Sequence, residues 1–173
     1  MIEIIKRTIS LITTLSLLAC ITVTACAANN YDWAKTEIKY CQDNGIIAGD
    51  EHGELNPGGT LTRAEMSKML VEAFDIPDGE AQSFDDINLD DWYYPYANAI
   101  KMYMTVPGNN FYPNEAVTRE EFASTLVSAS GLKASALCNL RILTDNFKDA
   151  DKVTTKYKTL LSIAVERGYY RGS

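Results

Sequence analysis

The chain has 173 residues, of which 46% are hydrophobic and 23% charged, which suits one globular domain or a short array of repeats rather than a disordered chain. Its formal net charge of -7 opposes a phosphate backbone, so we expect no nucleic-acid partner. His52 is the single histidine, which excludes within one chain a Cys2His2 zinc site and any catalytic scheme that needs two histidines.

Residues 1–27 have the pattern of a secretory signal peptide. Lys6 and Arg7 precede an uncharged, apolar run at residues 8–24, and small residues then surround Cys26 at the spacing of a signal peptidase site. The run is short for a membrane span, which needs about 20 apolar residues. We therefore expect an exported protein of the cell wall or cell surface. The alternative is a lipoprotein, bound to the membrane through a lipid on Cys26, because the residues before Cys26 resemble a bacterial lipobox.

Two cysteines, Cys41 and Cys138, follow the predicted signal peptide. One disulfide and two buried free thiols both fit an exported protein. Neither cysteine lies in a Cys-x-x-Cys pair, so we expect no metal and no cofactor. The Asp-rich stretches at residues 85–91 and 145–151 lack the glycine and the final glutamate of an EF-hand loop, which favours solvated loops over calcium sites.

Two stretches of the chain repeat one pattern, in which an apolar-x-Pro segment is followed after three residues by apolar-Thr-Arg-x-Glu. Residues 55–65 carry the first copy, and residues 111–121 carry the second copy 56 positions later. A degraded third copy follows, because residues 147–150 match residues 84–87 at the head of the second copy. The third copy has no Thr-Arg-x-Glu, so the repeat is incomplete there.

A second pair of positions supports the repeat. Trp33 precedes Gly49 by 16 residues, and Trp92 precedes Gly108 by 16 residues. Lys156 stands at the tryptophan position of the third copy. Matching spacings on both sides of a loop of variable length indicate an internal repeat rather than chance.

Each copy predicts a helix, a loop and a second helix. In the first copy, Gly45 follows apolar residues at helical spacing and indicates the end of a helix. Thr62 and Glu65 predict a capping box at the start of the next helix, and Thr118 and Glu121 repeat it. Pro95 lies near the start of the first predicted helix of the second copy, where its missing amide is tolerated. The apolar stripes of the other four predicted helices are Ala34, Ile38 and Cys41; Met66, Met69, Leu70 and Phe74; Phe122, Leu126 and Val127; and Leu160, Leu161, Ala164 and Val165. One amphipathic hairpin cannot bury its own stripe, so we expect a mainly all-α fold in which neighbouring copies share a core.

The repeated pattern resembles the S-layer homology repeat. On this resemblance the chain divides into a signal peptide at residues 1–27, a first repeat at 28–77, a second at 78–132 and a partial third at 133–173. The resemblance implies helix-loop-helix repeats packed as a pseudo-threefold array, here with the third repeat incomplete. It also implies a module that attaches exported proteins non-covalently to the cell wall.

The resemblance further implies a ligand and the residues that bind it. The family's usual ligand is a secondary cell-wall polysaccharide, which often carries pyruvate ketals. A guanidinium offers paired donors to a ketal carboxylate, an indole can stack on a sugar ring, and a glycine allows a close approach of the backbone. The residues of this chain at the matching positions are Arg63, Arg119, Trp33, Trp92, Gly49 and Gly108.

Both kinds of side chain also have a structural interpretation. Only six basic residues lie in residues 28–132, and two of them are Arg63 and Arg119. A cation at a helix start is unfavourable against the helix dipole, which favours ligand contact, while the alternative is an ion pair with a nearby carboxylate. Trp33 and Trp92 can serve as core anchors as well as ligand contacts.

We therefore predict an exported protein without enzymatic activity that binds a cell-wall polysaccharide and anchors at the cell surface. The alternative is a fragment or subunit whose third repeat is completed by another chain, through self-association or with another S-layer homology protein. A more remote alternative is an envelope glycan hydrolase, because two carboxylates suffice for glycoside hydrolysis. The carboxylates of this chain, however, are scattered over loops and helix caps.

Overall fold

The computed structural model describes residues 34–49, 54–56, 58–79, 84–132 and 139–170. The chain divides into two units, Met1–Ala34 and Lys35–Ser173, and every described residue except Ala34 lies in the second unit. The predicted signal peptide, Trp33, His52 and Cys138 lie outside the described residues. Within the described ranges no helix is long and apolar enough to cross a membrane.

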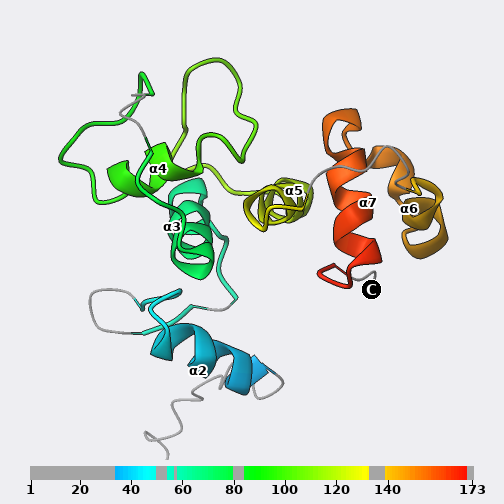
Figure 1. Cartoon of the computed structure of the whole chain (residues 1–173), viewed down its shortest axis with the longest axis horizontal. Helices are drawn as coiled ribbons and strands as arrows, with labels where there is room; N and C mark the ends of the chain where they lie inside the picture. The colour runs from blue at the N-terminus through cyan, green and yellow to red at the C-terminus, as the bar shows by residue number, and fades with distance from the viewer. Residues whose placement is uncertain (1–33, 50–53, 57, 80–83, 133–138, 171–173) are drawn as a thin grey trace, which may run out of the picture. The chain divides into compact units, whose positions relative to one another are not determined.

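The described residues form six α-helices and two short 3-10 helices, and their only β-pairing is one isolated bridge, which confirms the predicted mainly all-α fold (Figure 1). In chain order these elements are α2 (Lys35–Asp43), α3 (Arg63–Phe74), α4 (Tyr94–Ile100), α5 (Arg119–Ala129), α6 (Arg141–Asn146), η2 (Ala150–Lys152), η3 (Thr155–Tyr157) and α7 (Lys158–Glu166). Helix α6 is an addition that the repeat pattern did not predict. The pseudo-threefold arrangement stays a prediction.

Helix α2 ends as the sequence predicts. Gly45 adopts a φ of +73°, a left-handed conformation that glycine enters without a steric penalty, and the amide of Ile46 donates to the carbonyl of Cys41 at 2.9 Å. The predicted stripe residues Ile38 and Cys41 are half-buried, and none of the α2 side chains is fully buried. The thiol of Cys41 is free.

Helix α3 begins with the predicted capping box. The hydroxyl of Thr62 accepts from the amide of Glu65 at 3.3 Å, and the Glu65 carboxylate accepts from the amide of Thr62 at 2.8 Å. At the start of α5 only one of the two predicted capping-box hydrogen bonds forms. Thr118 accepts from the amide of Glu121 at 3.2 Å, but the Glu121 carboxylate turns away to an ion pair with Arg63. A buried cation is a stronger partner for a carboxylate than one exposed amide.

Removing the Thr62 hydroxyl tests the contribution of the box. We expect Thr62→Ala to lower the free energy of unfolding by about 1 kcal/mol, because one end amide of α3 loses its acceptor. Urea denaturation followed by circular dichroism would measure the change. Thr60→Ala is the control, since Thr60 is exposed and lies outside the helix. Equal stability of the two variants would show that the box contributes nothing.

Two core clusters form where the second helix of one repeat packs on the first helix of the next, as α3 does on α4 and α5 on α7 (Figure 1). The first cluster centres on Met66, Leu70, Phe84, Ile100 and Phe111. The second cluster centres on Val127, Leu143, Leu161, Ile163 and Ala164. The predicted sharing of a core between neighbouring copies therefore holds for both helix pairs.

Helix α5 contributes to both clusters through two of its faces. Phe122 and Leu126 pack against the first cluster. Ala123 and Val127, each one position further along the helix, belong to the second cluster. The helix is therefore a shared wall between two cores.

Candidate ligand-binding sites

Arg63, the first residue of α3, is buried in an ion pair. Its Nε donates to Oε1 of Glu121 at 2.9 Å, and the two side chains are each 7% exposed. Its Nη1 donates to the carbonyl oxygens of Phe111 at 2.9 Å and Tyr112 at 3.0 Å, and lies 3.4 Å from the exposed Glu115 carboxylate. We call this set of five residues the Arg63 junction.

The charges at the Arg63 junction keep the guanidinium protonated. Burial by itself would lower the pKa of Arg63, but hydrogen bonds and the negative charges of Glu121 and Glu115 outweigh burial and raise its pKa above the usual value. The Nε and Nη1 donors already serve protein acceptors. Of the two interpretations of Arg63, the structure favours the ion pair over contact with a ligand.

Backbone hydrogen bonds join the same two repeats. Residues 113–117 of the second repeat lie antiparallel to the start of α3. The amide of Arg63 donates to the carbonyl of Glu115 at 2.9 Å, and the amide of Ala64 donates to the carbonyl of Pro113 at 3.0 Å. Two of the amides that a helix start leaves without a partner are thus satisfied by the neighbouring repeat.

Asp86, in the loop before α4, binds the two residues that precede this stretch by two and one positions. Its two carboxylate oxygens accept from the amides of Phe111 and Tyr112, both at 2.7 Å. The rings of Phe84 and Phe111 pack with centroids 5.2 Å apart. Tyr112 adopts a φ of +54°, which is uncommon for a residue other than glycine. Asp86 and Arg63 therefore hold a strained backbone between them.

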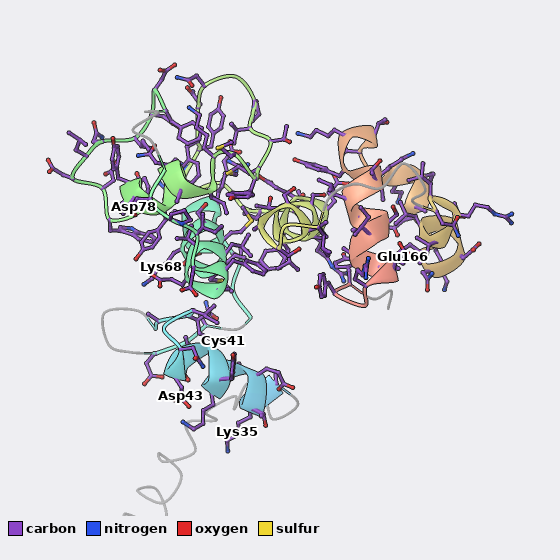
Figure 2. All side chains as sticks on the ribbon, in the orientation of Figure 1. Lys35, Cys41, Asp43, Lys68, Asp78 and Glu166 are labelled. Carbon is purple, nitrogen blue, oxygen red and sulfur yellow. The ribbon has the colours of Figure 1, made fainter. Side chains whose placement is uncertain are left out.

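A groove of about 1060 Å³ lies beside α3 and brings two predicted site residues together. Trp92 of the second repeat and Gly49 of the first repeat both line it, with Lys68 and Met69 of α3. Figure 2 labels Lys68 on α3. The Trp92 side chain is 55% exposed, and its ring meets Tyr93 edge-on at 5.4 Å. We call this the Trp92 groove, and the exposure of Trp92 favours ligand contact over a core role.

Lys68 supplies a positive charge to the Trp92 groove. It is half-buried and makes no hydrogen bond or ion pair with another described residue. Two carboxylates, those of Glu54 and Glu65, also line the groove, and the carboxylate of Glu65 is held in the capping box. An ammonium that pairs with none of the described carboxylates is available to an anionic ligand.

Arg119 lines a second, smaller pocket of about 360 Å³. Arg119 is exposed, its guanidinium lies 4.7 Å from the centre of the Tyr170 ring, and no carboxylate of the described residues pairs with it. Burial raises the pKa of the Tyr170 phenol, and the charge of Arg119 opposes that shift. Lys148, Lys152 and Asp149 also line this space, which we call the Arg119 pocket.

Gly108 and Arg63 are predicted site residues that line neither space. Gly108, in the loop after α4, adopts a φ of +63°, and a Cβ there would meet open space. Its backbone conformation explains the glycine without any ligand. Trp33 is outside the described residues. Of the predicted site residues that the structure describes, only Trp92 and Gly49 line the same groove.

Comparison with known proteins decides what the repeats are. Residues 28–67 and residues 83–123 each match the model of the S-layer homology domain. The chain carries S-layer homology repeats. The Trp92 groove receives side chains from both matched repeats, whereas the Arg119 pocket lies between the second S-layer homology repeat and the segment around α7.

Three curated proteins show the range of chains that carry similar S-layer homology repeats. The surface-layer 125 kDa protein of Lysinibacillus sphaericus is 32% identical over 144 residues, which cover 82% of this chain and 12% of the relative. S-layer protein EA1 of Bacillus anthracis is 36% identical over 106 residues, which cover 58% of this chain and 12% of the relative. Exoglucanase XynX of Acetivibrio thermocellus is 29% identical over 148 residues, which cover 82% of this chain and 13% of the relative.

The chain thus spans about an eighth of the length of these relatives. The names of these relatives describe whole proteins. A match over so small a part of them does not assign their functions, including that of the exoglucanase, to this chain. The S-layer homology domain is a non-catalytic anchoring domain, and its presence supports attachment to the cell surface in general.

Sequence reasoning missed two residues of these sites. Lys68 could have been found from the scarcity of cations in the acidic part of the chain, where it is one of six. Asp149 could have been found from the repeat, because it matches Asp86 at the head of the second S-layer homology repeat. Both signals are in the sequence, but neither is part of the Thr-Arg-x-Glu motif.

Proposed function

We propose that this chain attaches to the cell wall by binding a secondary cell-wall polysaccharide in the Trp92 groove. The observation that carries the proposal is the exposed indole of Trp92 beside Gly49 and Lys68 in one groove. The S-layer homology repeats supply the cell-surface context. Export by the predicted signal peptide at residues 1–27 is part of the same proposal.

Each of the three residues has a distinct role in this proposal. The indole of Trp92 offers an apolar face to a sugar ring and an N–H to a hydroxyl, while its edge contact with Tyr93 limits its rotation. Gly49 keeps that wall of the groove free of a side chain. The ammonium of Lys68 favours a polymer with negatively charged groups, such as pyruvate ketals, because a charge-assisted hydrogen bond is stronger than a neutral one.

Binding to purified cell walls tests the proposal. The full chain is co-sedimented with walls before and after acid removal of the secondary polymer, and binding should be lost from the stripped walls. We expect Trp92→Ala to weaken binding at least tenfold and Lys68→Gln to weaken it severalfold. The effect of Lys68→Gln should shrink in high salt, since screening weakens charge pairs at an accessible site.

Met102→Ala is the matched control, because Met102 is 91% exposed and lies outside the Trp92 groove. Circular dichroism of each variant separates loss of binding from loss of fold. Equal binding by Trp92→Ala and Met102→Ala would overturn the assignment of the groove. Binding that survives removal of the polymer would overturn the proposed ligand.

A further inference from the structure

The starting observation is how a segment of the second repeat contacts both Arg63 and Asp86. Residues 111–117 of the second repeat occupy the space between the start of α3 and the loop that carries Asp86. Arg63 donates to two carbonyl oxygens of this segment, and Asp86 accepts from two of its amides. Arg63 and Asp86 thus bind the backbone of one turn of the second repeat, whose Glu115 amide donates to the Tyr112 carbonyl at 3.1 Å, through one cation and one anion.

The Arg119 pocket repeats this device. Arg119 stands at the motif position of Arg63, and it begins α5 as Arg63 begins α3. Asp149 stands at the position of Asp86, and both Arg119 and Asp149 line the pocket. Helix α5 packs on α7 as α3 packs on α4, so the frame that carries the two charges is repeated as well.

The two sites differ in occupancy among the described residues. Arg63 is 6% exposed, whereas Arg119 is exposed and contacts the ring of Tyr170. Asp149 is exposed, and no described residue donates to its carboxylate. The amides of Arg119 and Glu120 find no acceptor in the described part of the chain, unlike those at the start of α3.

We propose that the Arg119 pocket is a docking site for a polypeptide turn with the pattern apolar-x-Pro-x-Glu, supplied by another chain. Residues 111–115 carry this pattern and occupy the equivalent place at the Arg63 junction. Arg119 would take two carbonyl oxygens of the incoming segment, and Asp149 would take two of its amides. The glutamate at the end of the pattern corresponds to Glu115, which lies 3.4 Å from Arg63.

The charges of the pocket favour a polypeptide over an anionic glycan. Lys148 and Lys152 join Arg119 in attracting the glutamate of the segment. Asp149 and Glu120 also line the pocket and would repel a ligand that carries only negative groups. A peptide backbone, with carbonyls and amides in alternation, satisfies both signs of charge.

Direct binding of a synthetic peptide tests this proposal. The probe is a fluorescein-labelled peptide with the sequence of residues 109–117, titrated with the full chain and followed by fluorescence anisotropy. We expect saturable binding, a loss of at least tenfold with Arg119→Gln or Asp149→Asn, and unchanged circular dichroism, since both side chains are exposed. Lys156→Gln is the matched control, an exposed cation outside the pocket.

Three results would overturn the proposal. One is the absence of saturable binding at millimolar concentrations by a chain shown to be folded. Another is equal binding of a peptide with the same composition in scrambled order. The third is a loss of wall-polysaccharide binding, but not of peptide binding, in Arg119→Gln, which would assign the pocket to the glycan. Because Trp92 and Lys68 lie outside the Arg119 pocket, failure of the wall assay leaves the peptide assay unaffected.

Discussion

Replacing Arg63 with glutamine should lower the free energy of unfolding by about 3–5 kcal/mol, because the change leaves the Glu121 carboxylate buried without its cation. The carbonyls of Phe111 and Tyr112 lose a charged donor at the same time. Domains of this size are stable by only about 5–15 kcal/mol, so a large part of the total is removed. Urea denaturation followed by far-ultraviolet circular dichroism measures the change.

Arg119→Gln is the matched control, since Arg119 holds the same motif position at the start of the next repeat but is exposed. We expect its effect on stability to stay below about 0.5 kcal/mol. The double variant Arg63→Met with Glu121→Leu should recover most of the loss, because an apolar pair of similar size leaves no buried charge unpaired. Equal effects of Arg63→Gln and Arg119→Gln would contradict the ion pair as the source of stability.

Asp86→Asn should lower the free energy of unfolding by about 2 kcal/mol, although the new side chain has almost the same size. An asparagine keeps one acceptor oxygen but turns an NH2 group toward an amide of Phe111 or Tyr112, which then has no partner. Loss of this anchor also releases the left-handed conformation of Tyr112. Amide hydrogen exchange should therefore quicken first at these two residues.

Asp149→Asn is the control for this variant, because Asp149 occupies the same position in the following copy and is exposed. Its stability should match that of the parent chain when no peptide is present. Similar destabilisation by both changes would mean that the carboxylates act through overall charge rather than through the two hydrogen bonds of Asp86.

The helices were predictable because their signals are local. Gly45 ends α2, Thr62 and Glu65 begin α3, and Pro95 lies in the first turn of α4, where its missing amide costs nothing. Each of these effects acts within one or two helical turns, so it can be read from neighbouring residues alone. Helix α6 escaped prediction because it has no counterpart in the first two copies.

The roles of the two motif arginines were not predictable in this way. Arg63 and Arg119 share one motif, and the pattern assigned them one role. Their environments differ because the partner of Arg63 is Glu121, which lies 58 positions further along the chain in the next repeat. A motif describes the side chain that is present, while the partner depends on how the copies pack. The second capping box failed for the same reason, since Glu121 belongs to the Arg63 junction.

Helix α5 has a consequence for how this chain loses its structure. In proteins built from repeats, each unit has a stability of its own and a coupling to its neighbour. Helix α5 contributes Phe122 and Leu126 to one core and Ala123 and Val127 to the other. Unfolding of either core therefore exposes part of the buried surface of α5. We therefore expect the two cores to unfold in one cooperative transition, so that a destabilising substitution in one repeat also destabilises the next.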